Sequence, residues 1–375
     1  MSGFNGNRLK EMRIVRRMTL EQLAQALGMT KQAVSKYEHN QSIPAAETVD
    51  KVLSILGIPF KYLCKEDIAF TEGCSALFFR AMSSTTKGNI DYADIKSRWG
   101  YEILSTIETS RSKLLNLPRI EANLSIPEKA LELRKHWGIG LLPIKNLTEL
   151  LEHNGIFVFI VDDTDLKTDA YSRIINGYPI IVLNKSKGTA VRWRFSLAHE
   201  LGHLLLHRSL SETDFTLRSK ELEDEANLFA EYFLMPVEGF KKSIIATKLE
   251  YFIPLKKEWG VSVAAMLYHC NRIGIVDSHK TKSLQIQMSK LGWKKKEPLD
   301  DAFEFEQPKL LESIISEQVR DHNSFDIFYD AVRLPIGEIE SLCSLQEGFF
   351  SIYYSGEAVG KPLSENPLYK QLSLF

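Results

Sequence analysis

The sequence predicts a multidomain protein: an all-α N-terminal domain, an α+β middle domain and a mostly helical C-terminal region. Three observations support this. Helical periods fill the first 65 residues, short β-branched and aromatic runs at 156–162 and 178–184 lie among helices in the middle of the chain, and the last ~90 residues are mostly helical. A chain of 375 residues, 44% hydrophobic and 25% charged, has room for two or three globular domains. We place the domains at 1–65, 126–285 and 286–375, with a helical connector at 66–125.

The N-terminal domain is predicted to contain five short helices with recognisable ends. Thr19 and Thr30 stand where a side-chain oxygen can cap the start of the second and third helices. Gly28 and Gly57 stand where a left-handed residue ends a helix. The second and third helices, joined by a turn that contains glycine, have the layout of a helix-turn-helix.

The third helix is expected to present polar side chains to double-stranded DNA. Its apolar residues face inward, which leaves its N-terminal end exposed, and there Gln pairs with adenine while Lys pairs with guanine or phosphate. The first 65 residues hold 10 Lys/Arg against 5 Asp/Glu, which favours a polyanionic partner. The alternative is a helical bundle that binds only protein. The candidate DNA contacts are Gln22, Thr30, Lys31, Gln32, Ser35 and Lys36.

Residues 7–64 resemble the Xre, or lambda-repressor-like, family. The family pattern T-x4-A-x3-G-x6-S-x2-E-x-G-x3-P is matched from Thr19 to Pro44, except that Asn40 replaces a glycine. That position needs a positive φ, which asparagine tolerates better than other non-glycine residues, so we expect the fold to be kept. The resemblance implies an operator-binding domain, and a homodimer because such repressors read two half-sites.

The middle domain contains His199-Glu200-Leu201-Gly202-His203 within a long apolar helix. Two histidines four residues apart lie on one face of a helix and can hold one metal ion. The glutamate beside them can deprotonate a metal-bound water, whose pKa zinc lowers towards ~7. We therefore expect Zn²⁺ bound by His199 and His203, with Glu200 as the general base.

A third metal ligand is expected from the following helix, in the segment ELEDEANLFAEYFLMP. A third histidine six residues beyond the pair is excluded, because positions 206 and 209 hold Leu and Ser where that pattern needs Gly and His. Glu223 follows His203 by 20 residues on a separate helix. Asn227, one turn beyond Glu223, can bond the second ring nitrogen of a ligand histidine.

Residues 126–295 resemble the ImmA/IrrE family of zinc-dependent peptidases, through RFSLAHELGHLLLH, the preceding PIIVLN and the following EDEANLFAEYFLMP. In that family the first Glu of E-x-x-[AC]-N-x-F-A is the third ligand, and it maps to Glu223. Glu225 is the second candidate and Glu221 the third. Family members cleave regulatory proteins, commonly repressors, so the resemblance implies a zincin-like endopeptidase domain in a transcriptional regulator.

Two alternatives stay open. The strand predicted at YPIIVLN, residues 178–184, is either an edge strand that holds an extended substrate or a plain core strand. The whole chain either cleaves a repressor-type protein or is a non-catalytic repressor or antitoxin-like transcription factor. In the second case its metal domain senses a signal or binds a partner.

Cysteine use and hydropathy favour a cytoplasmic protein. The four cysteines (Cys64, Cys74, Cys270, Cys343) are scattered without a C-x-x-C pair, so reduced thiols are expected. The first residues lack the apolar core of a signal peptide, and no segment approaches the ~18 apolar residues of a membrane span. We expect no membrane partner.

Overall fold

A computed structural model describes residues 3–68, 78–79, 86–107, 117–208, 210 and 212–353. The chain divides into two compact units. The first combines Met1–Thr71, Thr86–Thr109 and Glu312–Phe375; the second combines Glu72–Thr85 and Ser110–Leu311. Parts of the expected connector and of the C-terminal region lie outside the described residues. The multidomain class predicted from the sequence is confirmed, with helices at the N-terminus, a small mixed sheet with helices in the middle and a mostly helical C-terminal part.

The first five helices have the ends that the sequence predicts. Thr19 Oγ1 accepts from Gln22 N at 3.1 Å and Thr30 Oγ1 from Ala33 N at 3.2 Å, so both threonines are caps. Gly28 is left-handed at the end of the second helix, with φ 68°. The five helices are α1 (Gly6–Val15), α2 (Leu20–Leu27), α3 (Lys31–Glu38), α4 (Ala46–Leu56) and α5 (Phe60–Leu63).

Helix α1 and the end of α3 approach each other closely, and this explains why positions 6 and 40 hold glycine and asparagine. Asn40 has φ 56°, as its place in the helix-turn-helix pattern predicts, and its Oδ1 accepts from Gly6 N at 2.7 Å. A Cβ built on Gly6 would lie 1.9 Å from the carbonyl oxygen of Tyr37. A side chain at Gly6 would therefore push apart the start of α1 and the end of α3.

Helices from later in the sequence complete the first unit. Glu102 of α6 pairs with Lys65 at 2.5 Å and with Arg8 of α1 at 2.7 Å. Glu338 of α17 pairs with Arg16 of α1 at 2.5 Å, and Lys65 also donates to the carbonyl of Val332 in α16. The added helices are α6 (Lys87–Thr106), α16 (His322–Val332), α17 (Ile336–Leu342) and most of α15 (Leu310–Gln318).

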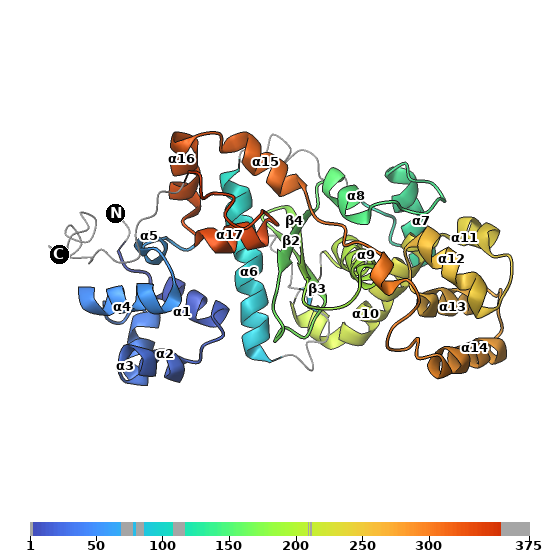
Figure 1. Cartoon of the computed structure of the whole chain (residues 1–375), viewed down its shortest axis with the longest axis horizontal. Helices are drawn as coiled ribbons and strands as arrows, with labels where there is room; N and C mark the ends of the chain where they lie inside the picture. Colours follow the sequence, from blue (N-terminus) through green and yellow to red (C-terminus); the bar gives the residue numbers. More distant parts are fainter. Residues whose placement is uncertain are drawn as a thin grey trace. The chain divides into compact units, whose positions relative to one another are not determined.

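The second unit contains a four-stranded mixed sheet and the helices that pack with it (Figure 1). The strand order is β1-β3-β4-β2, with β2 parallel to β4 and β3 antiparallel to both of its neighbours. The strands are β1 (Phe78–Phe79), β2 (Phe157–Val161), β3 (Ala170–Ile175) and β4 (Tyr178–Asn184). The helices are α7 (Ile126–His136), α8 (Leu147–His153), α9 (Ala190–Leu206), α10 (Glu212–Leu234), α11 (Val237–Ser243), α12 (Leu249–Trp259), α13 (Val263–Arg272) and α14 (Ser278–Lys290).

The sheet order decides the open question about YPIIVLN. This segment is β4, which lies between β3 and β2 and is therefore a core strand. The edge-strand interpretation of β4 is wrong. Strand β3 joins β4 through a tight turn at Asn176 (φ 48°) and Gly177 (φ 85°). On its other side, β3 pairs with β1.

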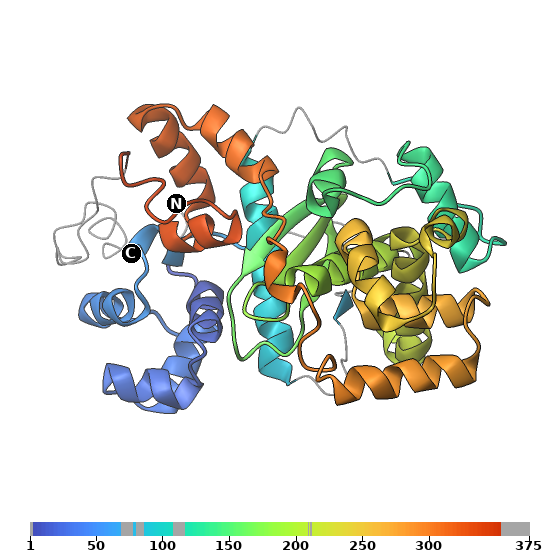
Figure 2. The same cartoon turned by 45° about the vertical axis from the view of Figure 1, so that its right-hand side comes forward.

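Helices α9 and α10 pack closely at a glycine. A Cβ on Gly202 would lie 3.3 Å from the Cα of Ala226 and 3.1 Å from Cδ1 of Phe229. Both helices pack into one apolar core together with β2, β3 and β4. Figure 2 shows the ribbon of these elements turned by 45° from the view of Figure 1. The glycine thus brings the backbone of α10 next to the two histidines of α9.

Within the described residues, no helix is long and apolar enough to cross a bilayer.

Candidate metal centre and DNA-binding face

Three side chains from α9 and α10 converge on one point. His199 Nε2 and His203 Nε2 are 3.1 Å apart. Glu223 Oε2 lies 3.4 Å from His199 Nε2, and its Oε1 lies 3.4 Å from His203 Nε2. One donor atom from each residue lies within 4.8 Å of the other two, so the group could hold a metal ion. These are the three residues proposed from the sequence as ligands.

The hydrogen-bond partners fix the tautomer of each histidine. The Asn227 Oδ1 atom, 3.0 Å from His199 Nδ1, only accepts, so His199 donates from Nδ1. His207 Nε2 donates to Glu225 Oε2 at 2.8 Å, which leaves its Nδ1 to accept from His203 Nδ1 at 2.9 Å. Both Nε2 atoms of the pair therefore carry a lone pair directed at the shared point.

Charge and burial leave this point without compensation from the chain. His199 and His203 are 2% and 1% exposed, and Glu223 Oε1 is buried without a hydrogen-bond partner among the described residues. Two lone pairs and a carboxylate facing one another repel unless a cation lies between them. The donor set therefore fits a bound metal ion.

The pKa of His203 agrees with a ligand-competent state. Burial lowers this pKa to about 3, so the ring is neutral at neutral pH. A neutral imidazole is the form that binds metals.

His207 and Glu225 form an outer pair behind His203. Glu225 was the second ligand candidate from the sequence. His207 is the residue after α9 and only 2% exposed, and its ring bridges His203 and Glu225. The four-residue spacing from His203 to His207 could have revealed the contact. Glu221, the third candidate, pairs with Arg218 at 2.9 Å.

Glu200 is held by a residue that the sequence analysis missed. The Ser172 hydroxyl in β3 donates to Glu200 Oε2 at 2.6 Å, and Glu200 is 2% exposed. The strand β3 was not predicted. Its signal was Asn176-Gly177 between two apolar runs, which is a strong hairpin pattern.

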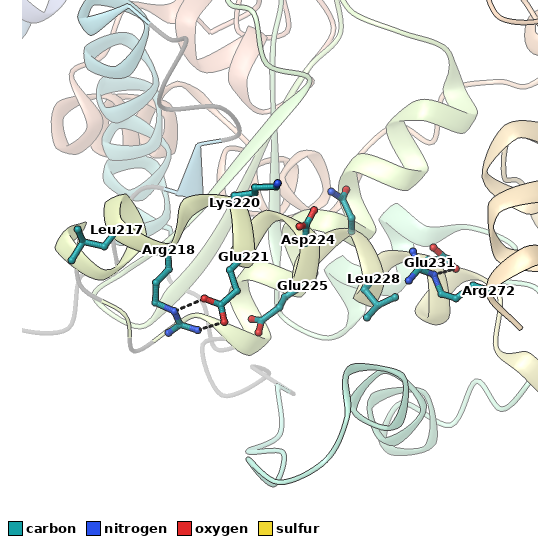
Figure 3. A pocket seen from close by; sticks show the side chains of 10 residues that line it. Leu217, Arg218, Lys220, Glu221, Asp224, Glu225, Leu228, Glu231 and Arg272 are labelled. Carbon is teal, nitrogen blue, oxygen red and sulfur yellow. Dashed lines mark hydrogen bonds and ion pairs between the residues drawn. The ribbon is translucent and has the colours of Figure 1, made fainter.

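A cavity of about 840 Å³ lies along the outer face of α10 (Figure 3). Glu221 bonded to Arg218, and Glu231 bonded to Arg272 of α13, line it together with the outer residues Glu225 and Asn227. Neither Glu200 nor any of the three convergent side chains is a lining residue. The cavity is therefore on the side of the outer hydrogen bonds rather than at the point of convergence.

The candidate DNA contacts lie on α2, on α3 and at the cap of α3. Lys31, Gln32 and Lys36 are exposed, and so is Thr30, which caps α3. Ser35 is half-buried. Gln22 is exposed, but its Oε1 accepts from Thr19 N at 2.7 Å in a capping box, which leaves its amide nitrogen for a base contact.

Comparison with known families assigns two parts of the chain. A helix-turn-helix family model matches residues 9–63. A peptidase family model, described as the IrrE N-terminal-like domain, matches residues 151–271, which include α9, α10 and all the side chains that converge there. A search of curated proteins found no match. The chain is therefore a fusion of an Xre-like helix-turn-helix DNA-binding domain with an ImmA/IrrE-like peptidase-family domain.

Proposed function

We propose that this protein is a DNA-binding transcriptional regulator whose second domain is a zinc-dependent endopeptidase that cleaves a repressor-type regulatory protein. The observation that carries the proposal is the convergence of His199, His203 and Glu223, with Glu200 next to the first histidine on the same helix. Two imidazoles and a carboxylate are the protein ligands of catalytic zinc in several peptidases, which leave a further position for water or substrate.

Each residue has a definite role in this proposal. His199, His203 and Glu223 hold the ion, which when bound supplies Lewis-acid polarisation of a peptide carbonyl and of a water. Glu200 removes a proton from the attacking water and returns it to the leaving amine. The Ser172 hydroxyl donates to Glu200 Oε2 at 2.6 Å. Ser172 thus fixes the orientation of the base.

The test is a Glu200→Gln variant of the whole protein. It should keep one equivalent of zinc and unchanged DNA affinity, yet lose cleavage of the partner protein. Proteomics of new N-termini, in cells that carry the wild type or the variant, identifies the cleaved protein. The control is Glu221→Gln, an exposed glutamate of α10 outside the convergent group. If Glu200→Gln regulates and cleaves as the wild type does, the enzyme proposal fails and the sensor or partner-binding alternative remains.

The DNA contacts have a separate test. Replacing Lys31 and Lys36 with alanine should weaken operator binding and flatten its salt dependence, by ~0.9 in slope for each lost phosphate contact. Lys51→Ala, an exposed lysine of α4, is the matched control for charge alone. An unchanged slope in the double variant would remove α3 as the DNA-contacting element. Footprinting of two half-sites tests whether the protein binds as a homodimer.

A further inference from the structure

The edge of β3 opposite β4 is already paired. The described part of β1 runs antiparallel to β3, with Phe78 opposite Ser172 and Phe79 opposite Tyr171. Ser172 is also the residue whose hydroxyl donates to Glu200 Oε2 at 2.6 Å. The main chain at Phe78 is therefore registered on the strand position that contacts Glu200.

This edge is where an extended peptide could bind. A peptidase acts on an extended main chain, and a sheet edge holds such a chain by adding it as one more strand. Strand β4 occupies one edge of β3, so the addition of a strand must use the other edge. Neighbouring strands lie only ~4.7–4.9 Å apart, so two chains cannot pair with the same residues of β3 at once.

We propose that β1 is an intramolecular competitor that occupies the substrate-binding edge of the candidate endopeptidase. The inference rests on the proposed function and adds the mode of substrate binding and its control. The occupant comes from outside the IrrE-like match: residues 78–79 follow the helix-turn-helix domain, whereas the match begins at residue 151. The segment that follows the DNA-binding domain thus supplies the strand that blocks the edge.

A competitor of this kind must be displaceable. The described ladder between β1 and β3 is two residues long, whereas β3 itself runs from Ala170 to Ile175. A substrate that pairs with all of β3 would compete with β1 for the same main-chain hydrogen bonds at Tyr171 and Ser172.

The experiment measures peptide binding in zinc-loaded Glu200→Gln protein, so that no cleavage occurs. The probe is a fluorescein-labelled peptide that copies residues 75–84, SALFFRAMSS. Phe78→Pro/Phe79→Pro removes two main-chain N–H donors, and it should bind the probe at least ~10-fold more tightly than the parent. Phe78→Ala/Phe79→Ala keeps the donors and should stay close to the parent. An equal gain in the alanine variant would contradict main-chain pairing.

A second pair of measurements keeps the test decisive if the proline variant is disturbed. Amide hydrogen exchange at residues 170–175 should be faster in the proline variant and slow again with the probe. A Phe79→Cys/Tyr171→Cys tether across the paired positions should abolish probe binding when oxidised and restore it when reduced. Equal probe affinity in parent, proline and tethered proteins would overturn the proposal.

Restoring Glu200 separates the two hypotheses. If the proline variant binds the probe more tightly, but mass spectrometry finds neither the probe nor a partner protein cut, β1 is a competitor and the endopeptidase proposal fails. If a partner protein is cut equally by the parent and the proline variant, the endopeptidase proposal stands and the competitor proposal fails.

Discussion

Two of the buried clusters of charged side chains in the described part of the protein differ in whether the chain supplies their counter-charges. In the first unit, Glu102 is bound by Arg8 and Lys65, and Glu11 by Arg8 and Arg98, with N–O distances of 2.5–3.0 Å. Burial acts to lower the pKa of Arg8, but Glu102 and Glu11 outweigh it and raise that pKa above its ordinary value. The chain supplies every cation that these carboxylates need.

The cluster around Glu223 in the second unit is incomplete. Glu223 contacts two neutral histidines, and within the described residues no Lys or Arg lies within 4.0 Å of it. The comparison shows how the two sites can be told apart: the first has its counter-charges in the chain, and the second directs its donors at a point where an external cation would complete it. The first stabilises the fold, whereas the second is arranged to bind.

The largest expected effect comes from a substitution in the incomplete cluster. Glu223→Ala should reduce bound zinc from about one equivalent to near zero after dialysis, because two histidines alone hold the ion weakly. Elemental analysis of the purified protein measures this. Glu221→Ala on the same helix, whose carboxylate pairs with Arg218, should keep its zinc. Full zinc in Glu223→Ala would remove Glu223 from the ligand set.

The next largest effect is expected from a substitution in the complete cluster of the first unit. Glu102→Ala leaves Arg8 and Lys65 buried without their shared carboxylate, which should lower the unfolding free energy of the first unit by about 3–5 kcal/mol. Urea unfolding followed by amide exchange in α1 and α6 reports it. The exposed pair Glu132–Lys135 provides the control, since Glu132→Ala should cost no more than ~1 kcal/mol. Zinc content should not change in either variant.

The buried carboxylate of Glu152 sharpens the comparison, because its described contacts include neither a cation nor a histidine. Glu152 accepts only from the backbone amides of Lys309 and Leu310 in the described contacts, and burial raises its pKa to about 7. Folding therefore takes up a proton between pH ~4.5 and ~7. The stabilisation is complete below pH ~4.5 and is lost as the pH rises to ~7, at most about 3 kcal/mol at 1.36 kcal/mol per pKa unit.

The measurement is the pH dependence of amide exchange in α8. The slope between pH ~4.5 and ~7 should be flatter in Glu152→Gln, which cannot ionise. Identical slopes in wild type and variant would show that Glu152 titrates as an ordinary surface carboxylate.

The smallest expected effect concerns the outer hydrogen bonds. Asn227→Ala frees the Nδ1 atom of His199, and Glu225→Ala removes the acceptor that fixes His207. Loss of such outer partners typically weakens metal affinity ~10–100-fold, which is about 1.4–2.7 kcal/mol. Competition with a zinc chelator measures it. An effect as large as that of Glu223→Ala would mean that the outer residue binds the metal directly.

Much of the N-terminal domain and of the convergent group could be predicted because the signals are local. Thr19, Thr30 and Gly28 mark helix ends within a few residues, and the spacing of His199 and His203 places both on one face of a helix. The position of Asn40 in the helix-turn-helix pattern predicted its positive φ, which the structure has.

The rest depends on contacts between distant residues. That Ser172 binds Glu200, and that Phe78 pairs opposite Ser172, requires knowledge of which strand passes beside α9. Whether β4 is an edge or a core strand stayed open for the same reason, since strand order is not encoded in one segment. The assembly of the first unit from three separate stretches also could not be inferred from the periodicity of any one of them.

That assembly has a consequence for biosynthesis. Lys65, next to the DNA-binding helices, donates to the carbonyl of Val332, which lies 267 residues later. At ~5–20 residues per second, a ribosome needs on the order of 10 to 50 s to make that stretch. The DNA-binding helices therefore reach their final surroundings only after the whole IrrE-like domain has been translated. A chain truncated within that domain would carry the helix-turn-helix sequence without the helices that complete its unit.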